Sequence, residues 1–204
     1  MMAKVNPAGG EFLTRKGKQT QQAIIDAVVA LIRSKGFAET TVKDICAEAG
    51  VGVGTFYHYF QSKVEVLLSF IGEENDELLA FYAQTDKTSY GDAILAVMNR
   101  YLDLYFIKGP ELVAQIYSTF LFSEIKLAGN LLENSLYKIL MDALEKGQQS
   151  GEFSDQISVE ILCNTFIGTW FFFTSLWCNE AQTYDIRAVV NQHFPQLIRL
   201  VSAK

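Results

Sequence analysis

The chain has 204 residues, of which 50% are hydrophobic and three are proline, so it can bury a sizeable core and is not a disordered protein. Its formal net charge of -6 is divided unevenly: residues 1–64 carry eight Lys/Arg against five Asp/Glu, and residues 65–204 carry nine against eighteen. Because association follows the local charge distribution, the basic first third is compatible with nucleic-acid binding despite the acidic total.

Residues 1–18 are rich in glycine and show no apolar period, which predicts a flexible basic arm. Two roles remain open for its cations, Arg15, Lys16 and Lys18. They either reach a minor groove or the DNA backbone beside the main site, or they only keep a disordered tail soluble.

A first helix is predicted from Thr20 to the residue before Gly36. Its apolar residues recur at helical spacing and should pack behind the two helices that follow. They are Ile24, Ala27, Val28, Leu31 and Ile32.

Residues 40–63 predict two short helices joined by a glycine turn, which is a helix-turn-helix pattern. Thr41 is a suitable N-cap and Asp44 completes a capping box, so the helix should begin at Val42. Gly50 should end it in the left-handed conformation, with Val51 closing the turn. The face turned toward neighbouring helices comprises Val42, Ile45, Cys46 and Ala49.

The second helix, roughly residues 53–60, should bury two phenylalanines four positions apart and expose its other side. That exposed side comprises Val53, Gly54, Thr55, Tyr57 and His58. Small residues let the backbone approach base edges, Thr55 offers a hydroxyl or a methyl group, and Tyr57 and His58 can reach phosphates. This side is predicted to enter a major groove.

Ser62 should cap a third helix whose first turn carries Lys63. A cation is disfavoured at that end of the helix dipole, so we expect Lys63 to share a DNA phosphate with the amides around it. The complete set of predicted DNA contacts is Thr41, Lys43, Val53, Gly54, Thr55, Tyr57, His58, Tyr59 and Lys63.

These residues resemble the DNA-binding domain of the TetR/AcrR family over about residues 19–75. The resemblance implies a transcriptional regulator with a helical second domain that dimerises and binds a ligand. Gly52, where the family commonly has a serine cap, and Val64, where it commonly has an acidic residue, depart from the pattern. The matching motifs are Gly36-Phe37, Thr40-Thr41-Val42, Asp44-Ile45, Ala49-Gly50-Val51, Gly54-Thr55-Phe56-Tyr57, Tyr59-Phe60 and Ser62-Lys63.

The remaining chain shows helical periods and no sustained alternation, so the fold class is all-α. We expect an N-terminal three-helix helix-turn-helix domain over residues 19–64, linked to a larger helical ligand-binding and dimerisation domain over residues 65–204. The helix that begins after Ser62 should continue past Tyr82. Further helices are predicted at 93–107, 111–123, 127–149, 158–179 and 185–201, with Pro195 kinking or dividing the last.

Residues 157–178 are the most apolar stretch and approach the length of a membrane span. Glu160 and Asn164 interrupt the run and no basic flank follows it, so a buried helix with two packed faces is the better interpretation. The bulky face comprises Cys163, Phe166, Trp170, Phe173 and Trp177. The face expected to meet the same helix of a second copy comprises Asn164, Gly168, Phe171, Ser175 and Asn179, and the helix from Asp185 would complete a four-helix dimer interface.

A ligand pocket is predicted among aromatic residues of the second domain, although an aromatic stripe at this spacing is also typical of plain core. Its ligand should be mainly apolar or aromatic, with tyrosine hydroxyls and Asn164 giving orientation. The predicted lining is Tyr101, Tyr105, Tyr117, Phe120, Trp170, Phe173 and Trp177.

Other chemistries find little support. Cys46, Cys163 and Cys178 form no close pair, which predicts small buried thiols and neither a disulfide scaffold nor a metal site. His58 and His193 lack partners at a diagnostic spacing. The glycines of the turn follow a helix rather than a strand, which excludes a dinucleotide-binding loop. We therefore expect no cofactor and no enzymatic activity.

The sequence thus predicts a cytoplasmic repressor, because no secretory signal is visible after the leading methionines. It should bind a palindromic operator as a homodimer and be released by a small effector. The alternative is a helical dimeric adaptor without DNA binding, which would leave the exposed polar cluster of the second short helix without a purpose.

Overall fold

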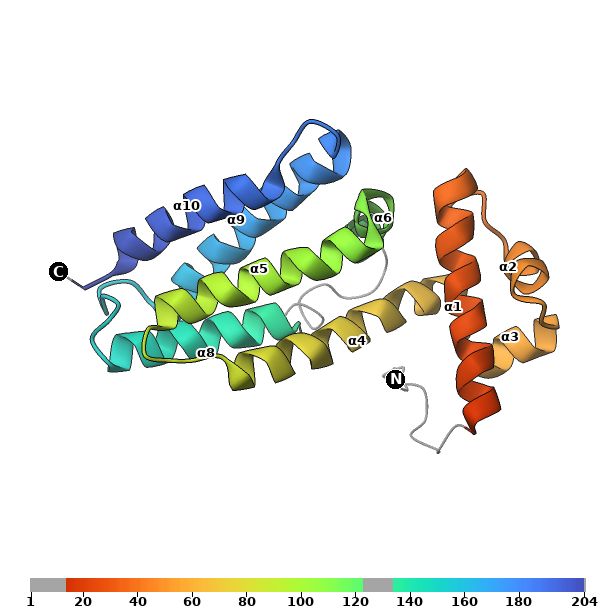
Figure 1. Ribbon diagram of the computed structural model, residues 1–204, viewed down its shortest axis with the longest axis horizontal. Coiled ribbons are helices and arrows are strands. Elements are labelled where there is room, and N and C mark those ends of the chain that lie inside the picture. Colours follow the sequence, from red (N-terminus) through yellow and green to blue (C-terminus); the bar gives the residue numbers. More distant parts are fainter. Residues whose placement is uncertain (1–13, 123–133, 204) are drawn as a thin grey trace. The chain divides into compact units, whose positions relative to one another are not determined.

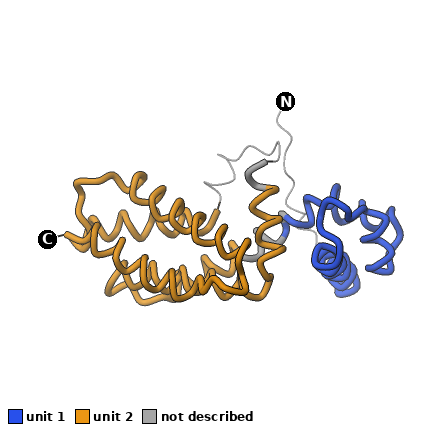
Figure 2. Tube along the Cα trace, turned by 90° about the horizontal axis from the view of Figure 1, so that it is seen from above, with its two compact units in different colours: residues 1–71 blue, residues 72–204 orange. Residues whose placement is uncertain are grey.

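The computed structural model describes residues 14–122 and 134–203, apart from the side chains of residue 68, residues 70–74 and residues 120–122. The chain divides into two compact units, residues 1–71 and residues 72–204 (Figure 2). Every regular element in the described ranges is a helix, and Phe153 and Ser202 form an isolated bridge. The all-α prediction is confirmed.

Unit 1 contains α1 (Arg15–Lys35), α2 (Val42–Ala49), α3 (Val53–Tyr59) and the start of α4 (Lys63–Gln84) (Figure 1). α2 packs against α1 and leads directly into α3. Its core is built from apolar side chains of all four helices, since Ile24, Val28, Ile45, Phe56 and Leu67 are fully buried.

α1 begins earlier than predicted, and the arm prediction is wrong for its last residues. The Thr14 hydroxyl accepts from the Gly17 N–H at 3.1 Å, and Lys18 N donates to Thr14 O at 3.0 Å. Thr14 is a suitable N-cap by residue type, whereas the apolar period that predicts the helix begins only at Ile24. Arg15, Lys16 and Lys18 lie exposed on the first turns of α1, and residues 1–13 lie outside the described residues.

Unit 2 contains the rest of α4, then α5 (Tyr90–Lys108), α6 (Pro110–Phe122), α8 (Ser135–Gln149), α9 (Val159–Glu180) and α10 (Ile186–Val201). α8 and α10 each pack against both α5 and α9, and α6 packs against α5 and α9 (Figure 1). Gly109 ends α5 with a φ of 84° and Pro110 occupies the first position of α6, where its missing N–H costs nothing. The predicted break there is confirmed.

Two predicted boundaries need correction. The helix predicted from Leu127 does not run through residue 134, because the Asn134 side chain accepts from Leu136 N and caps a helix that starts at Ser135. Residues 127–133 lie outside the described residues. α10 is not divided by Pro195: it continues to Val201, with Phe194 completely buried beside the proline.

Of the described helices, α9 alone is long and apolar enough to cross a membrane by length and composition. The same composition is found in the core helix of a globular domain. One side of α9 is packed within unit 2 through Leu162, Phe166, Trp170 and Trp177, which are all buried.

Candidate nucleic-acid interface

α2 is fixed at both ends by interactions that its own residues supply. The Asp44 N–H donates to the Thr41 hydroxyl at 3.2 Å, and the Asp44 carboxylate accepts from the Thr41 N–H at 2.8 Å. Gly50 follows with φ 65° and ψ 31°, and Val51 N donates to Cys46 O at 3.0 Å. The predicted capping box and glycine turn are confirmed.

Asp44 also joins α2 to α1, which the sequence did not indicate. Its carboxylate lies 2.8 Å from the Lys35 ammonium in the last turn of α1. The Lys35 ammonium and then the Thr41 hydroxyl and N–H hold the pKa of the Asp44 carboxyl well below its ordinary value. This carboxylate therefore stays charged and fixes the angle at which α2 leaves α1.

α3 turns one side inward and presents the other. Phe56 and Phe60 are 0% and 2% exposed, whereas Val53 and Tyr57 are 45% and 54% exposed. Gly54, Thr55 and His58 are exposed as well. Gly52 supplies no side-chain cap, so the first amides of α3 stay open to an outside acceptor.

The described structure leaves most of the predicted DNA-contact residues exposed. Thr41 and Lys43 are exposed at the start of α2, and five exposed residues follow on α3. Tyr59 is half-buried and its ring packs edge-on to His58, with centroids 5.0 Å apart. A short helix with an exposed side, supported by a second helix, is the arrangement that binding in a DNA major groove requires.

Lys63 is the exception, and the reason for placing it on a phosphate is wrong. Its ammonium donates to the carbonyl oxygens of Phe37 at 2.7 Å, Ala38 at 3.3 Å and Thr40 at 2.8 Å. It also lies 4.4 Å from the centre of the Phe37 ring. Three acceptors engage all three N–H bonds of an ammonium, so Lys63 ties α4 to the loop after α1.

Several residues predicted to line a pocket are buried in the hydrophobic core of unit 2, which is compatible with both the pocket and the plain-core interpretation. Tyr101, Tyr105, Trp170 and Trp177 are 3–7% exposed. The Tyr101 and Trp170 rings stack with centroids 5.4 Å apart. Tyr117 is half-buried and turns its hydroxyl toward α9, where it lies 2.7 Å from Thr174 Oγ1.

The remaining two residues of the predicted lining are Phe173 and Phe120. The Phe173 ring lies 4.8 Å from the ring of exposed His193 on α10, which places it away from the tyrosines. The side chain of Phe120 lies outside the described residues.

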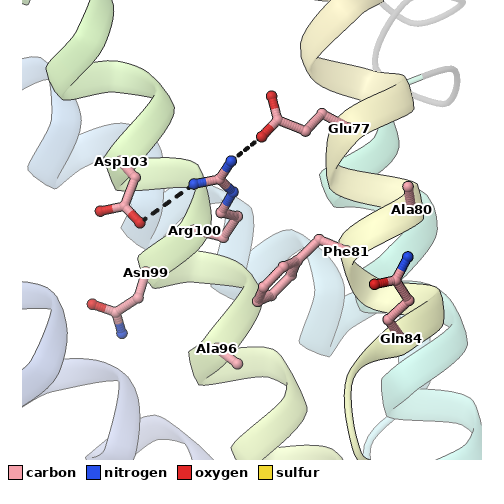
Figure 3. Close-up of a pocket in the computed structure, with 8 residues that line it drawn as sticks. All are labelled: Glu77, Ala80, Phe81, Gln84, Ala96, Asn99, Arg100 and Asp103. Carbon is pink, nitrogen blue, oxygen red and sulfur yellow. Dashed lines mark hydrogen bonds and ion pairs between the residues drawn. The ribbon is translucent and has the colours of Figure 1, made fainter.

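Two cavities that described residues line lie elsewhere. An open groove of about 580 Å³ lies between α4 and α5, with Ala80, Phe81 and Ala96 among its walls (Figure 3). A second, of about 300 Å³, lies at the α9–α10 turn between Phe106 and Trp177. Trp177 is the one residue of the predicted lining set that these two cavities include.

The outward side of α9 differs from the predicted dimer face at three positions. Asn164 and Gly168 are exposed and Ser175 is half-buried, but the Phe171 ring lies 4.8 Å from the Tyr117 ring and so faces α6. Ile161 and Phe172, which are 59% and 57% exposed, were missed. Phe172 lies four positions after Gly168 and Phe171 lies three, and both spacings place a residue on the same helical face as Gly168.

Comparison with known proteins agrees with this geometry. Residues 24–70 match the family model described as bacterial regulatory proteins, tetR family. The chain is 28% identical to the fatty acid metabolism regulator protein of Bacillus subtilis over 184 residues, which cover 86% of this chain and 92% of that protein. It is 27% identical to the transcriptional repressor KstR of Mycolicibacterium smegmatis over 144 residues, 66% of each chain.

A solved structure shares the whole architecture. The transcriptional regulator FadR from Bacillus subtilis, in complex with stearoyl-CoA, superimposes with a TM-score of 0.74 at 25% identity and covers 87% of this chain and 97% of that chain. These relatives are transcriptional regulators and not enzymes. With its capped helix-turn-helix unit and helical second unit, this chain belongs to the TetR family of bacterial regulatory proteins.

Proposed function

We propose that this protein is a ligand-responsive transcriptional repressor that binds a palindromic operator as a dimer. The observation that carries the proposal is the exposed side of α3, where Val53, Thr55, Tyr57 and their neighbours stand free of the core beside the capped start of α2. Thr55 would read base edges, while Lys43, Tyr57 and His58 would contact phosphates. The basic first turns of α1 add further charge.

Dimerisation supplies what one short recognition helix lacks. A helix of seven residues reaches few bases, and two half-sites about one turn of DNA apart multiply affinity and specificity. The exposed stripe of α9, which includes Ile161, Gly168 and Phe172, supports a helix-to-helix contact because glycine permits close approach and the apolar side chains gain burial. We expect Phe172→Glu to yield monomers in sedimentation velocity and to weaken operator binding. A dimer that survives this change at micromolar concentration contradicts the interface.

We propose the class of effector by comparison with a relative whose ligand is known. FadR from Bacillus subtilis was crystallised with stearoyl-CoA, and this chain matches nearly all of that chain. We propose a long-chain acyl thioester as the effector here, since unit 2 is rich in apolar and aromatic side chains on α5, α6 and α9.

Effector binding would act on the operator through α4, which contributes residues to both units. Within unit 2, Arg100 of α5 is ion-paired with Glu77 of α4 and lies 3.8 Å from Asp103 (Figure 3). Asp103 also pairs with Arg187 of α10. These contacts support a route between α4 and the helix expected at the dimer interface, provided that the effector favours one of two states.

The test combines selection and release. Fragments selected from random duplex DNA should share an inverted repeat, and stearoyl-CoA should release the bound protein in a gel-shift titration. The absence of any preferred duplex would contradict the repressor, whereas selection without release would contradict the effector class alone.

A further inference from the structure

A chain of hydroxyl groups joins α5, α6 and α9 inside unit 2. The Tyr105 and Tyr117 hydroxyl oxygens lie 3.0 Å apart, and the Tyr117 oxygen lies 2.7 Å from Thr174 Oγ1. The Thr174 hydroxyl donates to the Trp170 carbonyl oxygen at 2.8 Å. Since that proton is engaged, Thr174 accepts from Tyr117, and Tyr117 accepts from Tyr105. Each hydroxyl proton of this chain therefore already has an acceptor.

The Trp170 indole stands beside this chain with its donor unused. Trp170 is 3% exposed, and its Nε1 has no hydrogen-bond partner among the described residues. The indole lies close enough to the Tyr117 hydroxyl to affect its pKa, but the two groups do not meet hydrogen-bond geometry. Tyr101 stacks on the indole with an interplanar angle of 5°, which holds the N–H in place. A buried N–H without an acceptor costs free energy, so the protein gains from any acceptor that arrives.

We propose that the Trp170 N–H binds the carbonyl oxygen of the acyl thioester effector and thereby distinguishes a thioester from a ligand that lacks this oxygen. The inference rests on the proposed function and adds the residue that recognises the reactive end of the effector. Tyr105, Tyr117, Trp170 and Thr174 together form the Trp170 cluster.

The chemistry of the cluster selects a neutral acceptor. An indole nitrogen donates and does not accept, and the neighbouring hydroxyl protons are engaged, so the incoming atom must be an acceptor with a free lone pair, such as a carbonyl oxygen. Burial raises the pKa of the Tyr117 hydroxyl, with the Thr174 and Tyr105 hydroxyls and the Trp170 N–H each offsetting part of the rise. The same burial disfavours an ionised carboxylate, and the cluster contains no cation to compensate for it. A thioester carbonyl fits, and a free fatty acid does not.

The position of Tyr117 connects recognition to a response. Among the described residues, the side-chain hydrogen bonds that join α6 to α5 and α9 both end on Tyr117. An oxygen bound at the Trp170 N–H lies next to the Tyr117 hydroxyl and competes for its contacts. Effector binding at this point would therefore loosen α6 from α9.

The experiment compares two ligands that differ in one oxygen atom. Stearoyl-CoA and its thioether analogue S-octadecyl-CoA carry the same chain and the same headgroup, and calorimetric titration gives the affinity of the wild type for each. We expect the wild type to bind the thioester roughly tenfold more tightly, as one buried hydrogen bond allows. Stearate should bind at least tenfold more weakly than stearoyl-CoA. Equal affinity for thioester and thioether overturns the inference while leaving the effector class intact, and no binding of either overturns both.

The variant Trp170→Phe assigns the discrimination to one donor, because it keeps a buried ring and removes the N–H. Its affinity for the thioester should fall to that for the thioether. Trp177→Phe is the matched control, since Trp177 is equally buried on the same helix and packs against Phe106. The chain has two tryptophans, so the proton NMR spectrum of the wild type should show two indole N–H signals. The signal that is missing in Trp177→Phe belongs to Trp177, and the other belongs to Trp170. The Trp170 signal should move downfield with the thioester and not with the thioether, and a signal unmoved by both overturns the inference even if Trp170→Phe fails to fold.

Discussion

The two units of this protein are held together over different distances along the chain. In unit 1 the caps of α2 join residues three to five apart, such as Thr41 with Asp44, and the tie from Lys63 to Phe37 spans 26 residues. In unit 2 side-chain ties join residues 60 or more positions apart. The Glu152 carboxylate accepts from Tyr90 N at 2.7 Å and Gly91 N at 2.9 Å, and Tyr82 donates to Asp142 at 2.8 Å.

The two units therefore respond differently to substitution and to ligand binding. Local caps hold the recognition helices in a fixed form that can be presented to DNA without rearrangement. Ties between distant segments hold unit 2, and such contacts can be exchanged when a ligand competes for them, as proposed for Tyr117.

Gly147→Ala should have the largest effect, because it overpacks the turn after α8, where Phe153 enters the core of unit 2. A Cβ at this position would lie 2.2 Å from the ring of Phe153, which is 2% exposed and has no room to retreat. We expect a loss of about 3 kcal/mol in the free energy of unfolding, measured by urea denaturation. Gly54→Ala is the control, because nothing lies within 4 Å of the added atom. Equal stability of the two variants would contradict the close packing of Gly147 on Phe153.

Lys63→Ala should be next, and it separates a structural from a DNA-binding role. The change removes three hydrogen bonds to the loop at Phe37 and Thr40, and we expect a loss of about 1–2 kcal/mol, since the site is partly exposed. The salt dependence of operator binding should keep its slope. A stable variant with a reduced slope would restore the phosphate contact that the sequence predicted.

Lys43→Ala and Tyr57→Phe should leave folding intact and weaken DNA binding, because both side chains are exposed. Lys43→Ala should lower affinity about tenfold and reduce the salt slope by about one. Tyr57→Phe should lower affinity by a few fold, and Thr55→Val should change the preferred sequence instead. Gel shifts at several salt concentrations measure all three, and three unchanged titrations would remove these residues from the interface.

Asp44→Asn should have the smallest effect, and its size should depend on pH. The folded state holds the pKa of this carboxyl well below its unfolded value, so the carboxylate stabilises the fold above the unfolded pKa of about 3.9 and loses that contribution as the pH falls further. Thermal unfolding of wild type and variant should therefore differ at pH 7 and converge toward pH 2. A difference in melting temperature that stays constant over this pH range would show that the ionised carboxylate is not the source of the stabilisation.

Much of the fold was predictable from local signals. Thr41, Asp44, Gly50 and Pro110 act through their immediate neighbours, and the structure places all four as expected. The core face of α9 was likewise predicted from its aromatic spacing, since Phe166, Trp170 and Trp177 are buried. Phe171 was assigned to the wrong side because positions three and four residues from Gly168 are close on a helix and only the packing of α6 separates them.

By itself, the sequence determined the all-α class, the capped helix-turn-helix and the exposed side of α3, because caps, turns and helical faces depend on residues a few positions apart. The tertiary structure alone decided that Lys63 binds carbonyls of a loop more than twenty residues earlier, that Lys35 pairs with Asp44, and that the Trp170 N–H stands beside a chain of committed hydroxyls. A side chain with several possible partners takes the one that packing brings within reach, and that choice depends on how helices assemble rather than on any single stretch of the chain.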